Sequence, residues 1–161
     1  MATQVYPTVV QTAGENGACR EFWVKMTGLV GVASGSSGIV NTVENPFNED
    51  MLIWEALIIV TAGSGAVATD FDIGLGNTAA GGSSAAELAN GLSSTQLNVT
   101  GPYELSLVKA IAGPPLKPLW KAPLTSTTAD SWLCFDQNGS VNASTLRYTC
   151  LVKVIPQADL D

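Results

Sequence analysis

The sequence predicts an all-β protein, namely a jelly-roll-like β-sandwich with one short helix and an extended N-terminal arm. Residues 66–75, AVATDFDIGL, alternate apolar and polar side chains with the period of a half-buried strand. Turn signals recur between such segments, for example at Asn45-Pro46, Gly101-Pro102 and Asn138-Gly139. Only one segment has a helical pattern, and this combination favours a sandwich or jelly roll.

Eight segments have strand patterns. Residues 52–61 are rich in branched and aromatic side chains, which predicts a more fully buried strand than 66–75. Gly28 and Gly31 interrupt the long run at 19–33 and predict a bend or bulge. The helix is expected at 83–92, SSAAELANGL, from a serine cap, an early glutamate and a glycine stop. The remaining strands are expected at 5–11, 38–44, 103–111, 130–136 and 146–155.

The stretch 57–76 holds a glycine-rich centre, Gly63-Ser64-Gly65, between two of these strands. We expect a β-hairpin here, because two apolar runs joined by a few glycine-containing residues are typical of one. The glycines lack the Lys-Ser/Thr pair that completes a phosphate-binding loop. Asp70 and Asp72 are spaced like the start of a calcium loop, but no later carboxylate follows where that loop needs one. We therefore expect both carboxylates to be solvated on one strand face, with no bound metal.

The chain has 161 residues, which fits a single domain at 19–161 preceded by the arm at 1–18. The arm contains Pro7, Gly14 and Gly17, which do not suit a core strand. Residues 113–123, GPPLKPLWKAP, contain four prolines and should form an extended, stiff surface crossing.

The net charge of −7 excludes several classes of partner. Seven basic residues are scattered along the chain and form no stripe that could neutralise phosphates, so we expect no nucleic-acid binding. An anionic membrane surface would repel the chain for the same reason. The first residues lack the basic and apolar regions of a signal peptide, and the apolar run at 51–62 contains Glu55 and is too short to span a bilayer.

The chain has no histidine, which removes the commonest general base, the usual nucleophile triads and most zinc sites. A pair of carboxylates could still hydrolyse a glycoside, yet nothing in the sequence pairs any two of them across a cleft. We therefore expect no catalytic residue, no metal and no cofactor. The carboxylates considered are Glu49, Asp50, Glu55, Asp70, Asp72, Glu104 and Asp136.

The three cysteines form no CxxC pair, and their odd number argues against a disulfide framework. A C-terminal hairpin with its turn near Asn142 would place Cys134 opposite Cys150 and Trp132 opposite Val152. We expect these two thiols to be neighbours in the core and to remain reduced.

Most aromatic residues lie on strand patterns and are expected in the core. Trp120 differs because it lies among prolines and lysines in KPLWKAP. Three roles are open for it: a sugar-binding platform, an anchor for a protein partner, or a residue that folds back onto the core. The first role would make the protein a carbohydrate-binding β-sandwich module.

The segment NPFNEDMLIWEALIIVTAGSGAVATDFDIGLGNTAAGGSSAAELANGL, with the later DSWLCFDQNGS and STLRYTCLVKVIP, resembles small structural proteins of tailed bacteriophages. The likeness spans residues 45–155, and within that group it is similar to capsid decoration (cement) proteins. The resemblance implies a virion location on the capsid surface, the major capsid protein as partner, and a homotrimer. A tail or fibre component is the alternative within the same class.

The arm supplies the expected partner-binding residues. Its apolar side chains lie in a stretch too short to bury enough surface to offset its own ordering entropy. We therefore expect the arm to order against a neighbour, by strand addition or by lying on a capsid shell. The expected contact residues are Val5, Tyr6, Val9 and Val10 of the arm, together with Trp120 of the proline-rich segment.

Overall fold

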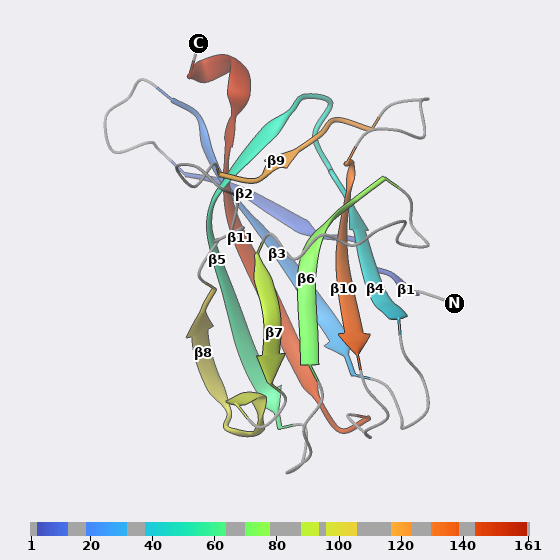
Figure 1. The fold of residues 1–161 in the computed structure, drawn as a ribbon. Coiled ribbons are helices and arrows are strands. Elements are labelled where there is room, and N and C mark those ends of the chain that lie inside the picture. Colours follow the sequence, from blue (N-terminus) through green and yellow to red (C-terminus); the bar gives the residue numbers. More distant parts are fainter. Residues whose placement is uncertain are drawn as a thin grey trace.

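The computed structural model describes residues 3–12, 19–31, 38–63, 70–77, 88–93, 96–105, 117–123, 130–138 and 144–160. These residues form two β-sheets that lie one behind the other (Figure 1). Sheet A has the strand order β1-β4-β10-β6-β7, and sheet B has the order β2-β3-β11-β5-β8. A short strand, β9, pairs with the beginning of β5 in sheet B.

The strands of sheet A are β1 (Thr3–Gln4), β4 (Gly38–Glu44), β10 (Trp132–Asn138), β6 (Asp70–Gly76) and β7 (Ala89–Ser93). Those of sheet B are β2 (Thr8–Thr12), β3 (Glu21–Val30), β11 (Arg147–Pro156), β5 (Met51–Ala62), β8 (Gly101–Glu104) and β9 (Leu119–Trp120). Two single 3-10 turns, η1 (Gln96–Asn98) and η2 (Gln157–Asp159), complete the described elements.

The order of these strands is that of a jelly roll. The chain passes from β3 in sheet B to β4 in sheet A, back to β5, and again to β6. It then runs from β7 to β8 and from β10 to β11, changing sheets each time. Two four-stranded sheets, β4-β10-β6-β7 and β3-β11-β5-β8, result from this double Greek key. The predicted fold class is therefore confirmed, and β1, β2 and β9 are additions to it.

The hydrophobic core lies between the two sheets, because apolar side chains at alternate positions of the strands point to the inner face of each sheet. Phe71, Ile73 and Leu75 of β6 are buried and belong to one cluster with side chains of sheet B. This is the face that the alternation in the sequence predicts. Val152 and Val154 of β11 supply part of the opposite wall.

Two predicted hairpins are wrong. β5 and β6 lie in different sheets, and so do β10 and β11, because each connection crosses the sandwich. Cys134 consequently pairs with Thr42 and Gly74 in sheet A, whereas Cys150 pairs with Met26 and Ile58 in sheet B. Both thiols are buried, and all three cysteines are free.

The predicted helix at 83–92 is wrong over its described part, because Ala89–Ser93 form β7 at the edge of sheet A. Residues 83–87 lie outside the described residues. The predicted bulge in the long strand is confirmed at Gly28, which has φ +75°. There, two residues of β3 oppose one residue of β11, and β3 stays within sheet B throughout.

Candidate partner-binding surface

The arm follows one margin of the sandwich and touches both sheets. β1 pairs in parallel with β4, and β2 pairs antiparallel with β3. Residues 5–7 therefore cross from the edge of sheet A to the edge of sheet B. The Val5 N–H donates a hydrogen bond of 2.8 Å to the Thr42 carbonyl oxygen, and its side chain packs against the core. Val5 thus fixes the crossing to its own domain.

The next side chains of the arm are exposed. Tyr6 is 81% exposed, Val9 39% and Val10 53%. In β2, Val9 is paired with Val24 and Val10 with Trp23, so the two valines point to opposite faces of sheet B. Three of the six large exposed apolar side chains found among the described residues therefore lie within five positions of one another.

This surface also lacks charge. Residues 3–12, TQVYPTVVQT, contain no ionisable side chain except the Tyr6 phenol, although the whole chain has a net charge of −7. Beside the arm, Trp23 is paired with Lys153 on the outer face of sheet B. The Lys153 ammonium lies 3.3 Å from a Glu21 carboxylate oxygen and 3.9 Å from one of Glu55. The uncharged arm thus borders charged side chains of both signs, because Lys25, which is paired with Thr8, is exposed, and Lys153 contacts Glu21 and Glu55.

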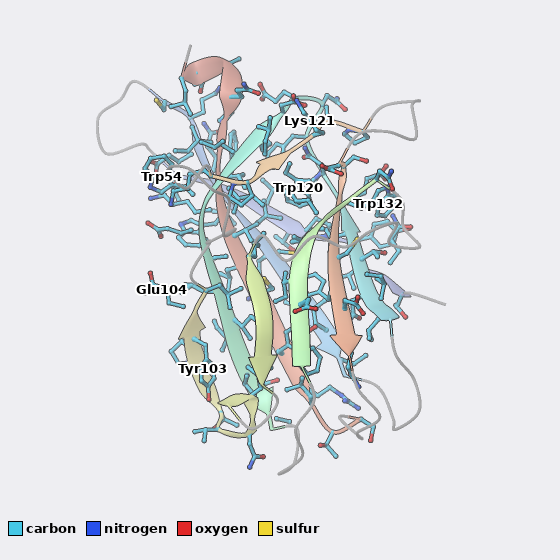
Figure 2. All side chains as sticks on the ribbon, in the orientation of Figure 1. Trp54, Tyr103, Glu104, Trp120, Lys121 and Trp132 are labelled. Atoms are coloured by element: carbon cyan, nitrogen blue, oxygen red, sulfur yellow. The ribbon has the colours of Figure 1, made fainter. Side chains whose placement is uncertain are left out.

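Trp120 does not belong to this surface. It is fully buried, and its Nε1 donates a hydrogen bond of 2.9 Å to the Ser131 carbonyl oxygen. Figure 2 places it inside the upper part of the sandwich, beneath β9. Of the three roles that the sequence left open, the structure therefore has the third, folding back onto the core. An indole without exposed surface cannot face a sugar or a protein in this state.

A buried asparagine explains why the proline-rich segment folds inward. The Asn45 side-chain amide donates to the carbonyl oxygens of Trp120 at 3.0 Å and Lys121 at 2.9 Å. Its Oδ1 accepts from the Phe47 N–H at 2.9 Å, which closes the Asn-Pro turn. The described residues 117–123 are thus tied to β5 and to this turn, whereas the sequence predicts a plain surface crossing.

Trp54 is the exposed tryptophan that sequence reasoning missed. The register of β5 against β11 shifts between Glu55 and Ile53, which leaves Trp54 as the extra residue of a bulge. It is 41% exposed, and the Lys117 ammonium lies 4.9 Å from its ring centroid. A bulge depends on pairing with a distant strand, so the local sequence contains no signal for it.

Several of the described carboxylates form ion pairs that connect segments far apart in the sequence. Arg20 donates to both oxygens of Glu49, at 3.1 and 3.0 Å, and to both oxygens of Asp159, at 3.0 and 2.9 Å. The Asp159 hydrogen bond, followed by that of Glu49, raises the pKa of Arg20, and the same contact lowers the pKa of Asp159. The bonds to Asp159 fasten η2 to the residue before β3, and the bonds to Glu49 attach the segment before β5 to the same residue.

Asp50 is held similarly by Lys121. The Lys121 ammonium lies 2.7 Å from Asp50 Oδ2, and the Ala122 N–H donates to Oδ1 at 2.8 Å. Partial burial opposes ionisation, but these two bonds outweigh it and lower the pKa of Asp50. An open hollow of about 290 Å³ is lined by Glu49, Asp50, Gln157 and Ala158. Both of its carboxylates are bound to basic groups, so neither is arranged as a general acid.

The remaining carboxylates do not converge on a site. Asp72 is half-buried and lies directly opposite Asp136 in the pairing of β6 with β10. The side chain of Asp70 lies outside the described residues. Glu55 and Glu104 are exposed on β5 and β8. Within the described ranges, no three metal-ligating side chains form a group that could hold an ion, and no helix has the length and apolar character to cross a membrane.

No protein-family model matches the chain, and no curated protein matches its sequence. Among solved structures, the fold is similar to a chain described as the capsid of Ralstonia phage GP4. The two share 14% sequence identity and a TM-score of 0.46, over 90% of this chain and 86% of that chain.

Proposed function

We propose that this chain is a non-enzymatic structural protein of a virus particle, and more specifically a decoration (cement) protein that binds the outside of a capsid. The observation that carries the proposal is the arm surface. A jelly roll presents exposed, uncharged apolar side chains next to a fixed anchor at Val5. Such a surface suits contact with another protein.

The fold and the sequence resemblance support the same class. Jelly rolls are frequent in viral capsid proteins, although lectins and cupins share them, so the fold by itself does not select a function. Glu49 and Asp50, the two carboxylates that line the hollow, are engaged in ion pairs, which favours a structural role over catalysis. The likeness of residues 45–155 to phage decoration proteins adds the capsid surface, the major capsid protein and a trimer to the proposal.

The chain would stabilise a capsid by binding to the assembled shell. A protein that binds the assembled state and not the separate subunits stabilises assembly by its binding free energy. Tyr6 is the side chain that we assign to the shell contact, because it is the most exposed apolar residue of the arm. Its backbone is held on both sides by β1 and β2, which reduces the entropy lost on binding.

The test uses capsids prepared without this chain from the virus that encodes it. We expect the wild-type protein to co-sediment with these particles and to raise their heat resistance. Tyr6→Ser should weaken binding at least about tenfold, the loss expected when a well-packed aromatic anchor is removed. Val99→Ser is the matched control, because Val99 is 66% exposed and lies outside the arm. Equal binding by both variants would remove Tyr6 from the contact.

The position of the protein on the virus particle distinguishes a capsid decoration protein from a tail or fibre component. Antibodies against the chain should label the heads of intact particles in electron micrographs. Labelling of tails or fibres alone would replace the decoration role with the tail alternative. The carbohydrate-module alternative depended on an accessible Trp120, and the burial of that residue leaves it without its proposed platform.

A further inference from the structure

We infer that the free edge of β2 pairs with β2 of a second copy of this chain about a two-fold axis. This inference rests on the proposed function only in that it assigns a partner to one part of the same arm surface. Tyr6 lies outside β2 and remains available for the shell. The pairing would join two B sheets into one continuous sheet.

The residues of β2 carry none of the features that usually protect a sheet edge. β2 is the terminal strand of sheet B, and no described residue pairs with its outer edge. Four of its five residues, Thr8–Gln11, are exposed. Soluble proteins usually protect such an edge with lysine, proline, a bulge or a very short strand. β2 has none of these features, whereas β8 at the opposite edge contains Pro102 and Glu104, and β1 has only two residues.

The exposed valines indicate an occupant at the edge rather than on a face. Val9 and Val10 point to opposite sides of sheet B, and both are substantially exposed. A partner lying flat on one side would cover only one of them. An added strand contacts both, because its side chains alternate in step with those of β2, and it also satisfies the outward N–H and C=O groups.

The sequence of β2 is complementary to itself. In an antiparallel pair centred on Val10, residue numbers sum to 20. Val10 then faces Val10 of the partner subunit, Val9 faces Gln11, and Thr8 faces Thr12. A residue at a two-fold axis lies beside its own copy, so a charged residue there would face an identical charge. TVVQT has no charge, in a chain whose net charge of −7 disfavours most self-contacts.

The paired strands would also have the distribution of side chains that is typical of a protein interface, apolar at the centre and polar at the ends. On the outer face, Val10 is paired with Trp23, Trp23 with Lys153, and Lys153 with Glu55. Across the axis this rung has an apolar centre of two valines and two tryptophans. Ion-paired lysines and glutamates lie at both ends. An apolar centre with a polar rim is typical of protein contacts. A three-fold contact joins unlike surfaces and would use other parts of the domain.

Sedimentation velocity measures the association in solution. A single strand pair buries little surface, so we expect a concentration-dependent dimer between about 10 µM and 1 mM. Val10→Arg places two like charges at the axis and should raise the dissociation constant about tenfold or more. Val99→Arg, the matched control on another exposed valine, should leave the dissociation constant unchanged.

Engineered disulfides test the register. Directly paired Cα atoms in antiparallel strands lie about 4.5 to 5.5 Å apart, within the range that a disulfide spans. Val10→Cys should therefore form a covalent dimer under mild oxidation. Thr8→Cys should form one when mixed with Thr12→Cys but little alone. Val99→Cys gives the rate at which disulfides form by random collision. The wild type gives the rate of dimer formation through native Cys19.

The results of the sedimentation and cross-linking experiments decide whether two copies of β2 pair. A wild-type protein that stays monomeric, with Val10→Cys no faster than Val99→Cys, overturns the inference. So does an association that survives Val10→Arg, or cross-links that form equally well at all positions. Dimerisation without binding to capsids would uphold this contact and contradict the proposed function. Capsid binding by a monomer that fails the cross-linking test would contradict this contact and uphold the proposed function.

Discussion

The indole Nε1 of Trp120 donates a hydrogen bond of 2.9 Å to the carbonyl oxygen of Ser131, the residue before β10. This bond connects β9, an addition to sheet B, with the neighbourhood of sheet A. It satisfies the only polar atom of a large side chain that has no exposed surface. Trp120 therefore connects the two sheets at the end of the sandwich where β9 lies.

Replacing Trp120 with alanine should lower the free energy of unfolding by about 3–5 kcal/mol, because it removes a fully buried aromatic side chain. Trp54→Ala is the matched control on a 41% exposed tryptophan. It should cost only about 1 kcal/mol, mainly through its contact with Lys117. Urea unfolding followed by circular dichroism measures both. Similar losses for the two variants would contradict the difference in burial.

Asn45→Ala should lower the free energy of unfolding by about 2–4 kcal/mol, since it leaves the buried Trp120 carbonyl and neighbouring backbone groups without their partners. Asn48, three residues later, is exposed, and Asn48→Ala should change stability by less than about 0.5 kcal/mol. Parallel urea titrations compare the two. An Asn45→Ala protein as stable as Asn48→Ala would show that water replaces the amide.

The pKa of Asp159 should depend on Arg20. Hydrogen bonds from Arg20 lower the pKa of Asp159 below its ordinary 3.8. Because the folded-state pKa is depressed, the contribution of this contact is fully present above pH 3.8. It is lost as the pH falls through the lowered value. Carbon-detected NMR titration of Arg20→Gln should show the pKa of Asp159 returning toward 3.8.

Lys121→Gln provides the control for that titration. It should raise the pKa of Asp50, whose carboxylate binds Lys121, and leave that of Asp159 unchanged. The exposed Arg20 contacts should add little to global stability, since solvent screens them. Movement of both pKa values in either variant would mean that the two ion pairs are coupled.

The three thiols should differ in reactivity toward a thiol reagent. Burial raises the pKa of Cys150 to about 12, so almost no thiolate exists at neutral pH. Cys134 is fully buried as well, whereas Cys19 is partly exposed. The native protein should therefore react at one position, Cys19, and the unfolded protein at all three. Mass spectrometry after labelling identifies the sites, and a Cys134–Cys150 disulfide would contradict the pairing of β10 and β11 with different strands.

Gly63→Ala should lower the free energy of unfolding by about 1–3 kcal/mol, because a methyl group at Gly63 would overlap the Asn98 carbonyl oxygen of η1. Gly28→Ala provides a comparison in which space is free and only the left-handed backbone is strained. That strain should cost about 1–2 kcal/mol. Thermal unfolding of Gly63→Ala at the wild-type temperature would show that η1 moves aside.

The strands were predictable where their side chains alternate or form apolar runs. The face of β6 that carries Phe71, Ile73 and Leu75 follows from sequence alone, because period two fixes which side chains share a face. β7 was missed because Ala89–Ser93 is short and contains alanine, asparagine and glycine, which favour strands weakly. The serines and the glutamate before it, together with Gly91 inside it, matched helix signals instead.

Which strands pair with each other, and in which sheet, could not be predicted from the sequence in the same way. Glycine-rich connectors mark a reversal of the chain, but a reversal within one sheet and a crossing between two sheets have the same local sequence. The placement of β6 and β11 depends on contacts with residues far along the chain. Trp120 is similar, because its burial follows from Asn45, which lies 75 residues earlier. The exposure of Tyr6, Val9 and Val10 agrees with an arm that has little core to cover it, and their partners stay a prediction.

The central position of β11 affects how the chain can fold during synthesis. β11 is synthesised after every other described strand, yet it lies between β3 and β5 in the middle of sheet B and pairs with both. Until residue 156 has emerged, β3 has no neighbour on that side, and the growing chain holds unpaired apolar strands. Non-local pairing of this kind also slows folding. We expect sheet B to close only after β11 has been synthesised, so the strands made before it stay without their central partner until then.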